Sequence, residues 1–139
     1  MHFLLTLVLL AAEGPLQPVN AFLNALANAD ADALVATFHD DATVFLPMTT
    51  APQRMRGKQQ IRDAFAPAFT QWGKSKRAEP GELETEIHGD TAIVTFHLGK
   101  LQPDQPTSFS RRTFVLTRKD GRWLIAHLHA SNVMLQPKK

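Results

Sequence analysis

The sequence contains no cysteine and no tyrosine, and these two absences exclude several kinds of active site. Without cysteine there is no disulfide framework, no thiolate nucleophile and no cysteine-ligated zinc or iron–sulfur site. Without tyrosine no phenol is present to act as a proton or hydrogen-bond donor. The sequence also has no glycine-rich phosphate loop, no phosphate-loop lysine and no dinucleotide fingerprint, so it implies no cofactor.

Charge is sparse and unevenly distributed. The 139 residues carry a formal net charge of +2, from 15 Lys and Arg against 13 Asp and Glu. Residues 1–50 contain no Lys or Arg, so any preference for anions is expected from residues 51–139. Such a small excess of positive charge gives no indication of a nucleic-acid partner. The 44% hydrophobic content and the nine Phe residues predict one folded domain with a sizeable core.

The longest apolar run covers residues 3–12 and is too short to cross a bilayer, which takes about 20 residues. We therefore expect no membrane span. Two interpretations of residues 1–12 stay open: a signal peptide of an exported or periplasmic protein, or an N-terminal helical extension of a cytoplasmic one. A Gly-Pro pair at residues 14–15 marks a break, so a single domain is expected over residues 15–134, followed by a C-terminal tail at 135–139.

Apolar spacing and turn residues predict three helices followed mainly by strands. Helical periodicity covers residues 16–29, 31–38 and 57–72. Pro67 lies inside the third helix, which is therefore expected to kink or end near Ala66. Runs of β-branched and aromatic residues predict strands at residues 42–47, 82–88, 91–98, 108–118 and 122–134. Helices followed by an antiparallel sheet indicate an α+β fold.

Strict alternation along the last strand leaves neither of its faces suited to solvent. One face would carry Leu124, Ala126, Leu128 and Ala130. The opposite face would carry Trp123, Ile125, His127, His129 and Ser131. Because one face must pack on the helices, the other needs a second partner, and another copy of the same sheet would provide it. We therefore predict a symmetric homodimer whose dimer face consists of the Trp123 to Ser131 set.

The element order resembles the SnoaL-like branch of the nuclear transport factor 2-like superfamily, with FHDDATVFLP near the start, GKQQIRDAF in the middle and RKDGRWLIAHLHASN at the end. The resemblance covers residues 15–134, and the end of the chain is also similar to the association domain of calcium/calmodulin-dependent kinases. It implies a cystatin-like cone, in which three N-terminal helices pack on a strongly bent mixed or antiparallel sheet. It also implies a ligand cavity between helices and sheet, and dimers formed through the sheet.

Ketosteroid isomerases share this resemblance but use two groups that the chain lacks. Their catalytic aspartate corresponds to Leu46, and their phenol donor corresponds to Phe22. Steroid isomerisation by that mechanism is therefore disfavoured. The resemblance implies instead an apolar pocket for an unknown small apolar ligand, lined by Phe22, Val44, Leu46, Phe65, Arg112, Phe114, Ala126, Leu128 and Ala130.

Four polar side chains on the predicted strands are candidates for chemistry. His97 is a catalytic acid or base if it faces the cavity, and a solvent-edge or core histidine if it does not. Arg112 either binds a ligand carboxylate at the pocket mouth or extends to solvent. His127 and His129 have a spacing that metal sites use, but no third ligand is identifiable. We therefore predict no metal site there and favour a pair of neutral imidazoles in the dimer face.

Three functions stay open on the sequence, because the fold hosts many unrelated activities. The first is binding of a small, mostly apolar molecule in the cone. The second is an isomerase, dehydratase or cyclase that uses His97 as its acid or base. The third is a non-catalytic oligomerisation module.

Overall fold

The computed structural model describes residues 14–48, 53–99 and 108–134. Its helices are α1 (Leu16–Asn28), α2 (Ala31–Val35) and α3 (Gly57–Trp72). Its strands are β1 (Phe38–Phe45), β2 (Met55–Arg56), β3 (Gly81–His88), β4 (Thr91–Leu98), β5 (Ser108–Lys119) and β6 (Arg122–Met134). The α+β class is confirmed, whereas the expectations for residues 1–12 and 135–139 lie outside the described residues. No helix within the described ranges is long and apolar enough to span a membrane.

The second helix is shorter than predicted, and the first strand begins earlier. α2 begins with an N-cap at Asp30, whose Oδ1 accepts a hydrogen bond from Ala33 N at 3.0 Å. The helix ends at Val35, because Phe38 already pairs with Ile125 of β6 as the first residue of β1. Pairing with a neighbouring strand therefore decides the conformation of a segment whose own periodicity is helical.

α3 runs through Pro67 to Trp72, so the prediction that it could end near Ala66 is wrong. A proline inside a helix removes one backbone donor and crowds the preceding turn. Here Pro67 is exposed, while the flanking Phe65 and Phe69 are buried and lie with their ring centroids 5.6 Å apart. Burial of these two rings against the core offsets the loss of one hydrogen bond.

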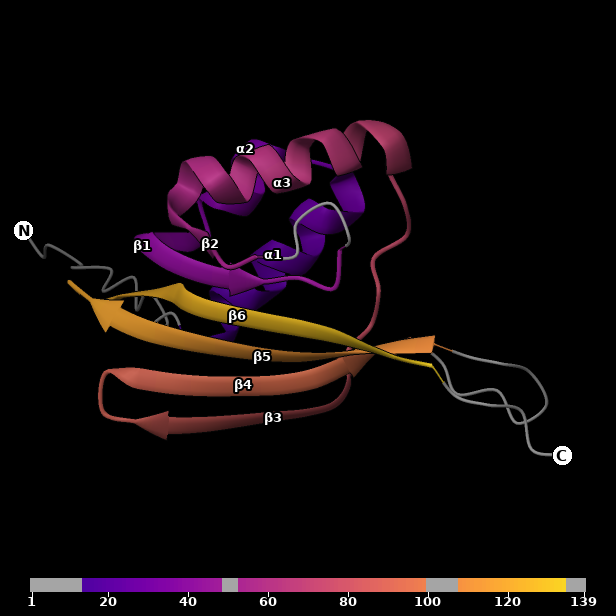
Figure 1. Cartoon of the computed structure of the whole chain (residues 1–139). Coiled ribbons are helices and arrows are strands. Elements are labelled where there is room, and N and C mark those ends of the chain that lie inside the picture. Colours follow the sequence, from indigo (N-terminus) through magenta and orange to yellow (C-terminus); the bar gives the residue numbers. More distant parts are fainter. Residues whose placement is uncertain (1–13, 49–52, 100–107, 135–139) are drawn as a thin grey trace, which may run out of the picture.

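The strands form one mixed sheet in the order β2-β1-β6-β5-β4-β3. β1 is parallel to β6, and every other pairing is antiparallel. Figure 1 shows the three helices gathered on one side of the sheet near β1, whereas β3 and β4 lie at the edge farthest from the helices. The described part of the chain therefore has one helix-covered sheet face and one face with no helix over it, called the outer face below.

Phenylalanines fill the space between the helices and the sheet. Phe22 of α1 is fully buried and meets three other rings edge to face: Phe38 at 5.9 Å, Phe65 at 6.2 Å and Phe114 at 5.2 Å between centroids. Phe96 of β4 stacks on Phe114 at 5.5 Å. These rings bring together residues from both layers, so they form the centre of the core.

β6 contains a β-bulge that changes which side chains face the helices. Leu116 of β5 pairs with Ile125, but Val115 pairs with His127, so Ala126 is an extra residue on β6. One inserted residue reverses the alternation along the rest of a strand. Odd-numbered side chains of β6 therefore face the helices before Ala126, and even-numbered ones face them after it.

The predicted composition of the dimer face is wrong because of this bulge. Trp123 and Ile125 are 3% and 0% exposed and belong to the helix-facing core. His127, His129 and Ser131 lie on the outer face, since they pair with β5 residues on that side. Only the second half of the predicted face is therefore available to a partner.

Candidate functional site

Most of the predicted pocket residues converge on the helix-facing side of the sheet. They come from α1, α3, β1, β5 and β6, and five of them belong to one buried cluster: Phe22, Val44, Phe65, Phe114 and Leu128. Leu46 packs against the edge of that cluster and stays partly exposed. Ala130 is buried directly opposite Arg112 on the neighbouring strand. The structure thus brings together an apolar wall with Leu46 and Arg112 at its borders.

Ala126 is the one predicted pocket residue that the structure places elsewhere. It lines a separate surface cleft of about 380 Å³, together with His39 and Thr117. One ring nitrogen of His39, Nε2, lies 3.1 Å from the carbonyl oxygen of Thr117 and 2.6 Å from its hydroxyl. His39 is therefore held by β5 and contributes to the packing of β1 rather than to the apolar wall.

Arg112 is partly buried and lies on the helix-facing side of β5. Its cross-strand neighbours are Phe96 on β4 and Ala130 on β6, both of them core residues. Burial lowers the pKa of Arg112 to about 10, because the guanidinium is poorly solvated there. Its Nε atom is buried without a hydrogen-bond partner, and the same holds for Oγ of Ser110, two residues earlier on the same side of β5. In the described part of the chain, no ion pair includes Arg112.

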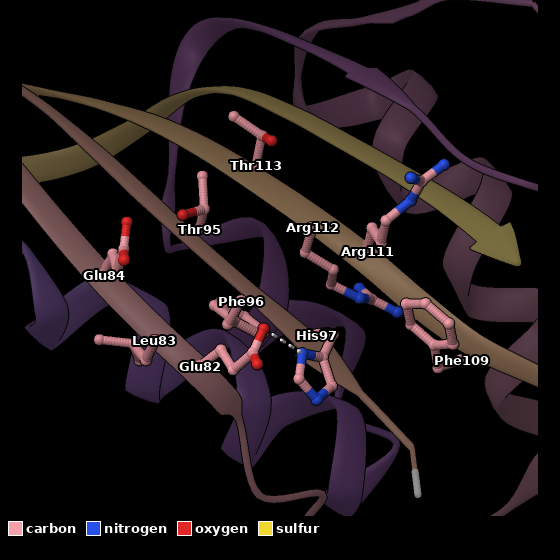
Figure 2. Close-up of a pocket in the computed structure, with 10 residues that line it drawn as sticks. All are labelled: Glu82, Leu83, Glu84, Thr95, Phe96, His97, Phe109, Arg111, Arg112 and Thr113. Atoms are coloured by element: carbon pink, nitrogen blue, oxygen red, sulfur yellow. Dashed lines mark ion pairs between the residues drawn. The ribbon is translucent and has the colours of Figure 1, made fainter. Parts of the chain in front are cut away.

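His97 does not face the apolar wall. It is on the outer face, because it pairs with Arg111 while its neighbour Phe96 pairs with Arg112. Its Nδ1 lies 3.8 Å from Oε2 of Glu82, which Figure 2 shows reaching across from β3. The ring also lies over the backbone of Gly81, where even a methyl group would clash with it. A general acid or base at His97 would therefore act on the outer face and not in the cone.

The outer face carries an open cleft of about 780 Å³ around His97 (Figure 2). Its lining comes from three adjacent strands: Glu82, Leu83, Glu84, Thr95, Phe96, His97, Phe109, Arg111, Arg112 and Thr113. Two of these residues, Phe96 and Arg112, belong to the helix-facing side of the sheet, so the cleft extends as far as Arg112. Glu82 enters this cleft because β3 has a register shift between Gly81 and Glu84, with Glu82 at a φ of 50°. No pattern in the sequence predicts this cleft, because the side chains of an exposed edge strand have no apolar alternation that would reveal a bulge.

His127 is held at the β1–β6 junction on the outer face. Its Nδ1 lies 2.7 Å from Oγ1 of Thr43, and Phe45 contacts the rings of both His127 and His129. Desolvation, and to a lesser degree the charges of His129 and Arg54, lower the pKa of His127, so its imidazole is neutral at pH 7. No group of three metal-ligating side chains occurs among the described residues.

The comparisons with known proteins agree with this architecture. The sequence model of the SnoaL-like domain matches residues 16–136. No curated protein matches the chain by sequence. A nuclear transport factor 2-like protein of unknown function from Pseudomonas putida is 21% identical, with a TM-score of 0.70 over 83% of this chain and 81% of its own.

Two further solved structures share the fold. A candidate ketosteroid isomerase from Parabacteroides distasonis is 23% identical, with a TM-score of 0.67 over 87% of this chain and 89% of its own. A candidate calcium/calmodulin-dependent protein kinase II association domain from Xanthomonas campestris is 20% identical, with a TM-score of 0.62 over 88% and 91%. At these identities the likeness establishes the cystatin-like fold and no activity. Because the family match spans nearly all of the described residues, the chain belongs to the SnoaL-like family.

Proposed function

We propose that the chain binds a small, mostly apolar molecule between the helices and the helix-facing side of the sheet. The observation that supports this function is the polar border of the apolar wall, where Nε of Arg112 and Oγ of Ser110 are buried without partners. Buried polar atoms in folded proteins nearly always have a partner, because an unpaired one costs about 1–3 kcal/mol. A ligand that enters beside the wall would supply the missing partners.

Binding is favoured over steroid isomerisation of the ketosteroid isomerase type. Leu46 packs at the edge of the apolar cluster, where that chemistry would need a carboxylate base. Phe22 lies at its centre among other rings, where that chemistry would need a phenol. Neither side chain can move a proton.

A thermal-shift screen of the full-length chain against neutral apolar compounds tests the proposal. Leu46→Asp puts a carboxylate at the edge of the apolar wall, so compounds that stabilise the wild type should fail to stabilise this variant. Leu83→Asp is the matched control, because Leu83 is 38% exposed on β3, away from the helices. Equal stabilisation of both variants would contradict binding at this wall.

The second candidate is an isomerase, dehydratase or cyclase that uses His97, and its specific support is the neighbouring Glu82 carboxylate. A carboxylate near Nδ1 orients an imidazole for proton transfer through Nε2. The substrate would occupy the outer cleft, and turnover would be abolished by His97→Ala and reduced by Glu82→Gln. Activity that survives His97→Ala would remove this candidate.

The third candidate, an oligomerisation module, is supported by the outer face. Phe45 and Val115 are partly exposed apolar residues there, next to His127. We propose that a second copy of the chain covers this region. Sedimentation velocity of the full-length chain is the direct test, and a monomer at all concentrations used would exclude the module.

A further inference from the structure

We propose that the ligand of the apolar wall is a monocarboxylate, whose carboxylate is bound by Arg112 and Ser110. This inference rests on the proposed binding function and names the chemical class of its ligand. Both side chains leave β5 toward the helices, because their cross-strand neighbours on β4 are Phe96 for Arg112 and Leu98 for Ser110. Two positions along a strand are about 6.6 Å apart, a span that an extended arginine side chain easily covers.

The first reason is charge. Arg112 stays protonated at neutral pH even when buried, so its positive charge needs an anion nearby. The carboxylates of the described chain that form ion pairs do so with Lys58, Arg62, His88, His97 and Arg118. No described carboxylate therefore forms an ion pair with Arg112, and an anionic ligand would balance this charge.

The second reason is the number and shape of the donors. A guanidinium binds the two oxygens of a carboxylate with two parallel hydrogen bonds, and a serine hydroxyl can donate a third. One positive charge balances one negative charge, which favours a carboxylate over a phosphate dianion. Arg77, the other described arginine with a buried unpaired Nε, already donates from its Nη2 to Asn20 of α1 at 2.8 Å. The Arg77 side chain is therefore already hydrogen-bonded to α1.

The third reason is the surface beside the guanidinium. Phe96 and Phe114 lie next to Arg112 on β4 and β5, and their rings stack with an interplanar angle of 16°. The two rings are 5% and 0% exposed, so the side chains around the guanidinium are apolar and favour a ligand with an aryl or alkyl body. The predicted ligand is therefore an apolar acid with one carboxylate, such as an arylalkanoate or a medium-chain fatty acid.

Titration calorimetry of the full-length chain with 4-phenylbutyrate and octanoate tests this assignment. The corresponding amides keep the shape and remove the charge, and phenyl phosphate offers a dianion in place of the carboxylate. We expect the acids to bind at least tenfold more tightly than their amides. Arg112→Met should reduce this ratio to about one, and Ser110→Ala should reduce it in part. Arg111→Met, one residue away on the outer face, should leave the ratio unchanged.

The outcomes separate the inference from the proposed function. If the amides bind as tightly as the acids, or phenyl phosphate binds more tightly, the monocarboxylate assignment is wrong while binding at the wall stands. If neither acids nor amides bind at millimolar concentration, both fail. If Arg111→Met and not Arg112→Met removes the preference, the anion binds on the outer face. If Arg112→Met does not fold, Arg112→Lys is the second variant, because it keeps the positive charge but removes the planar guanidinium. If this variant still binds the acids as preferentially over the amides as the wild type does, the two hydrogen bonds from the guanidinium to the carboxylate are wrong.

Discussion

Replacing Arg112 with methionine should make the unliganded protein more stable. Methionine keeps an unbranched stem of similar length beside Phe96 and Phe114 but removes the buried charge. Burial lowers the pKa of Arg112 to about 10, which corresponds to roughly 3 kcal/mol against the charged form, at about 1.4 kcal/mol per pH unit. The sign is destabilising, because at pH 7 the guanidinium is charged in both states and is poorly solvated only when folded. With relaxation and lost stem contacts, we expect a gain of about 1–3 kcal/mol in the free energy of unfolding.

Urea unfolding followed by tryptophan fluorescence measures this gain. Trp123 is 3% exposed in the fold, so its emission changes when the core opens. In thermal unfolding, each kcal/mol corresponds to about 4 °C in Tm for a domain of this size. Arg111→Met is the matched control, because Arg111 is exposed on the opposite face of the same strand, and its variant should stay within about 0.5 kcal/mol of the wild type.

A loss of stability in Arg112→Met would refute the reasoning. Removing a guanidinium that already has a partner leaves that partner unpaired and costs about 3–5 kcal/mol. A destabilised variant, with Arg111→Met unaffected, would therefore mean that Arg112 is satisfied within the unliganded protein. The monocarboxylate inference would then lose its first reason. A stabilised variant that no longer binds 4-phenylbutyrate would instead mean that the protein carries a destabilising charge for the sake of its ligand.

Three other predictions concern the outer face. The pKa of His127 is lowered in the folded state, so below about pH 6.5 the unfolded chain takes up a proton first and the wild type should lose stability. The urea midpoint should therefore fall between pH 7.5 and pH 5, and it should fall less in His127→Gln than in the wild type. An equal fall in both proteins would exclude this histidine as the cause. Gly81→Ala should lower the free energy of unfolding by about 1–2 kcal/mol in the wild type, because the added methyl group meets the His97 ring, and by close to nothing in a His97→Ala background. A double-mutant cycle that shows no coupling between the two positions would contradict this clash. Val115→Glu should turn the proposed dimer into a folded monomer in sedimentation velocity, whereas a persistent dimer would show that its interface lies elsewhere.

Local patterns were sufficient for the buried faces of α1 and α3 and for most of the apolar wall. Phe22 and Phe65 sit on helix faces that the 3.6-residue period already marks as buried, and both are at most 3% exposed. Val44 and Phe114 lie on strands whose alternation identifies one buried face, and both are fully buried. Where one face of an element is clearly apolar, burial follows from the sequence without knowledge of the partner.

The surroundings of His97 could not be predicted in the same way. Its cleft depends on a bulge in β3, where the backbone of Glu82 adopts a positive φ and brings its carboxylate toward the imidazole. β3 is an edge strand whose side chains are mostly exposed, so no alternation of polar and apolar residues records its register. The pairing with β4 has to be seen before Glu82 and His97 can be recognised as neighbours.

The alternation of apolar residues could not reveal the bulge at Ala126, because Leu124 and Ala126 are apolar as well and share the even positions of Leu128 and Ala130. In the structure, the buried residues of β6 are Trp123 and Ile125 at odd positions and Leu128 and Ala130 at even positions, and all four are at most 3% exposed. A strand with one buried face cannot keep both pairs inside without an extra residue between them, and the small Ala126 accommodates it. Because Trp123 and Ile125 turn inward, the outer part of β6 is left with histidines and a serine. A dimer formed there would depend on neutral imidazoles, so its stability should fall in the same acidic range in which His127 becomes protonated.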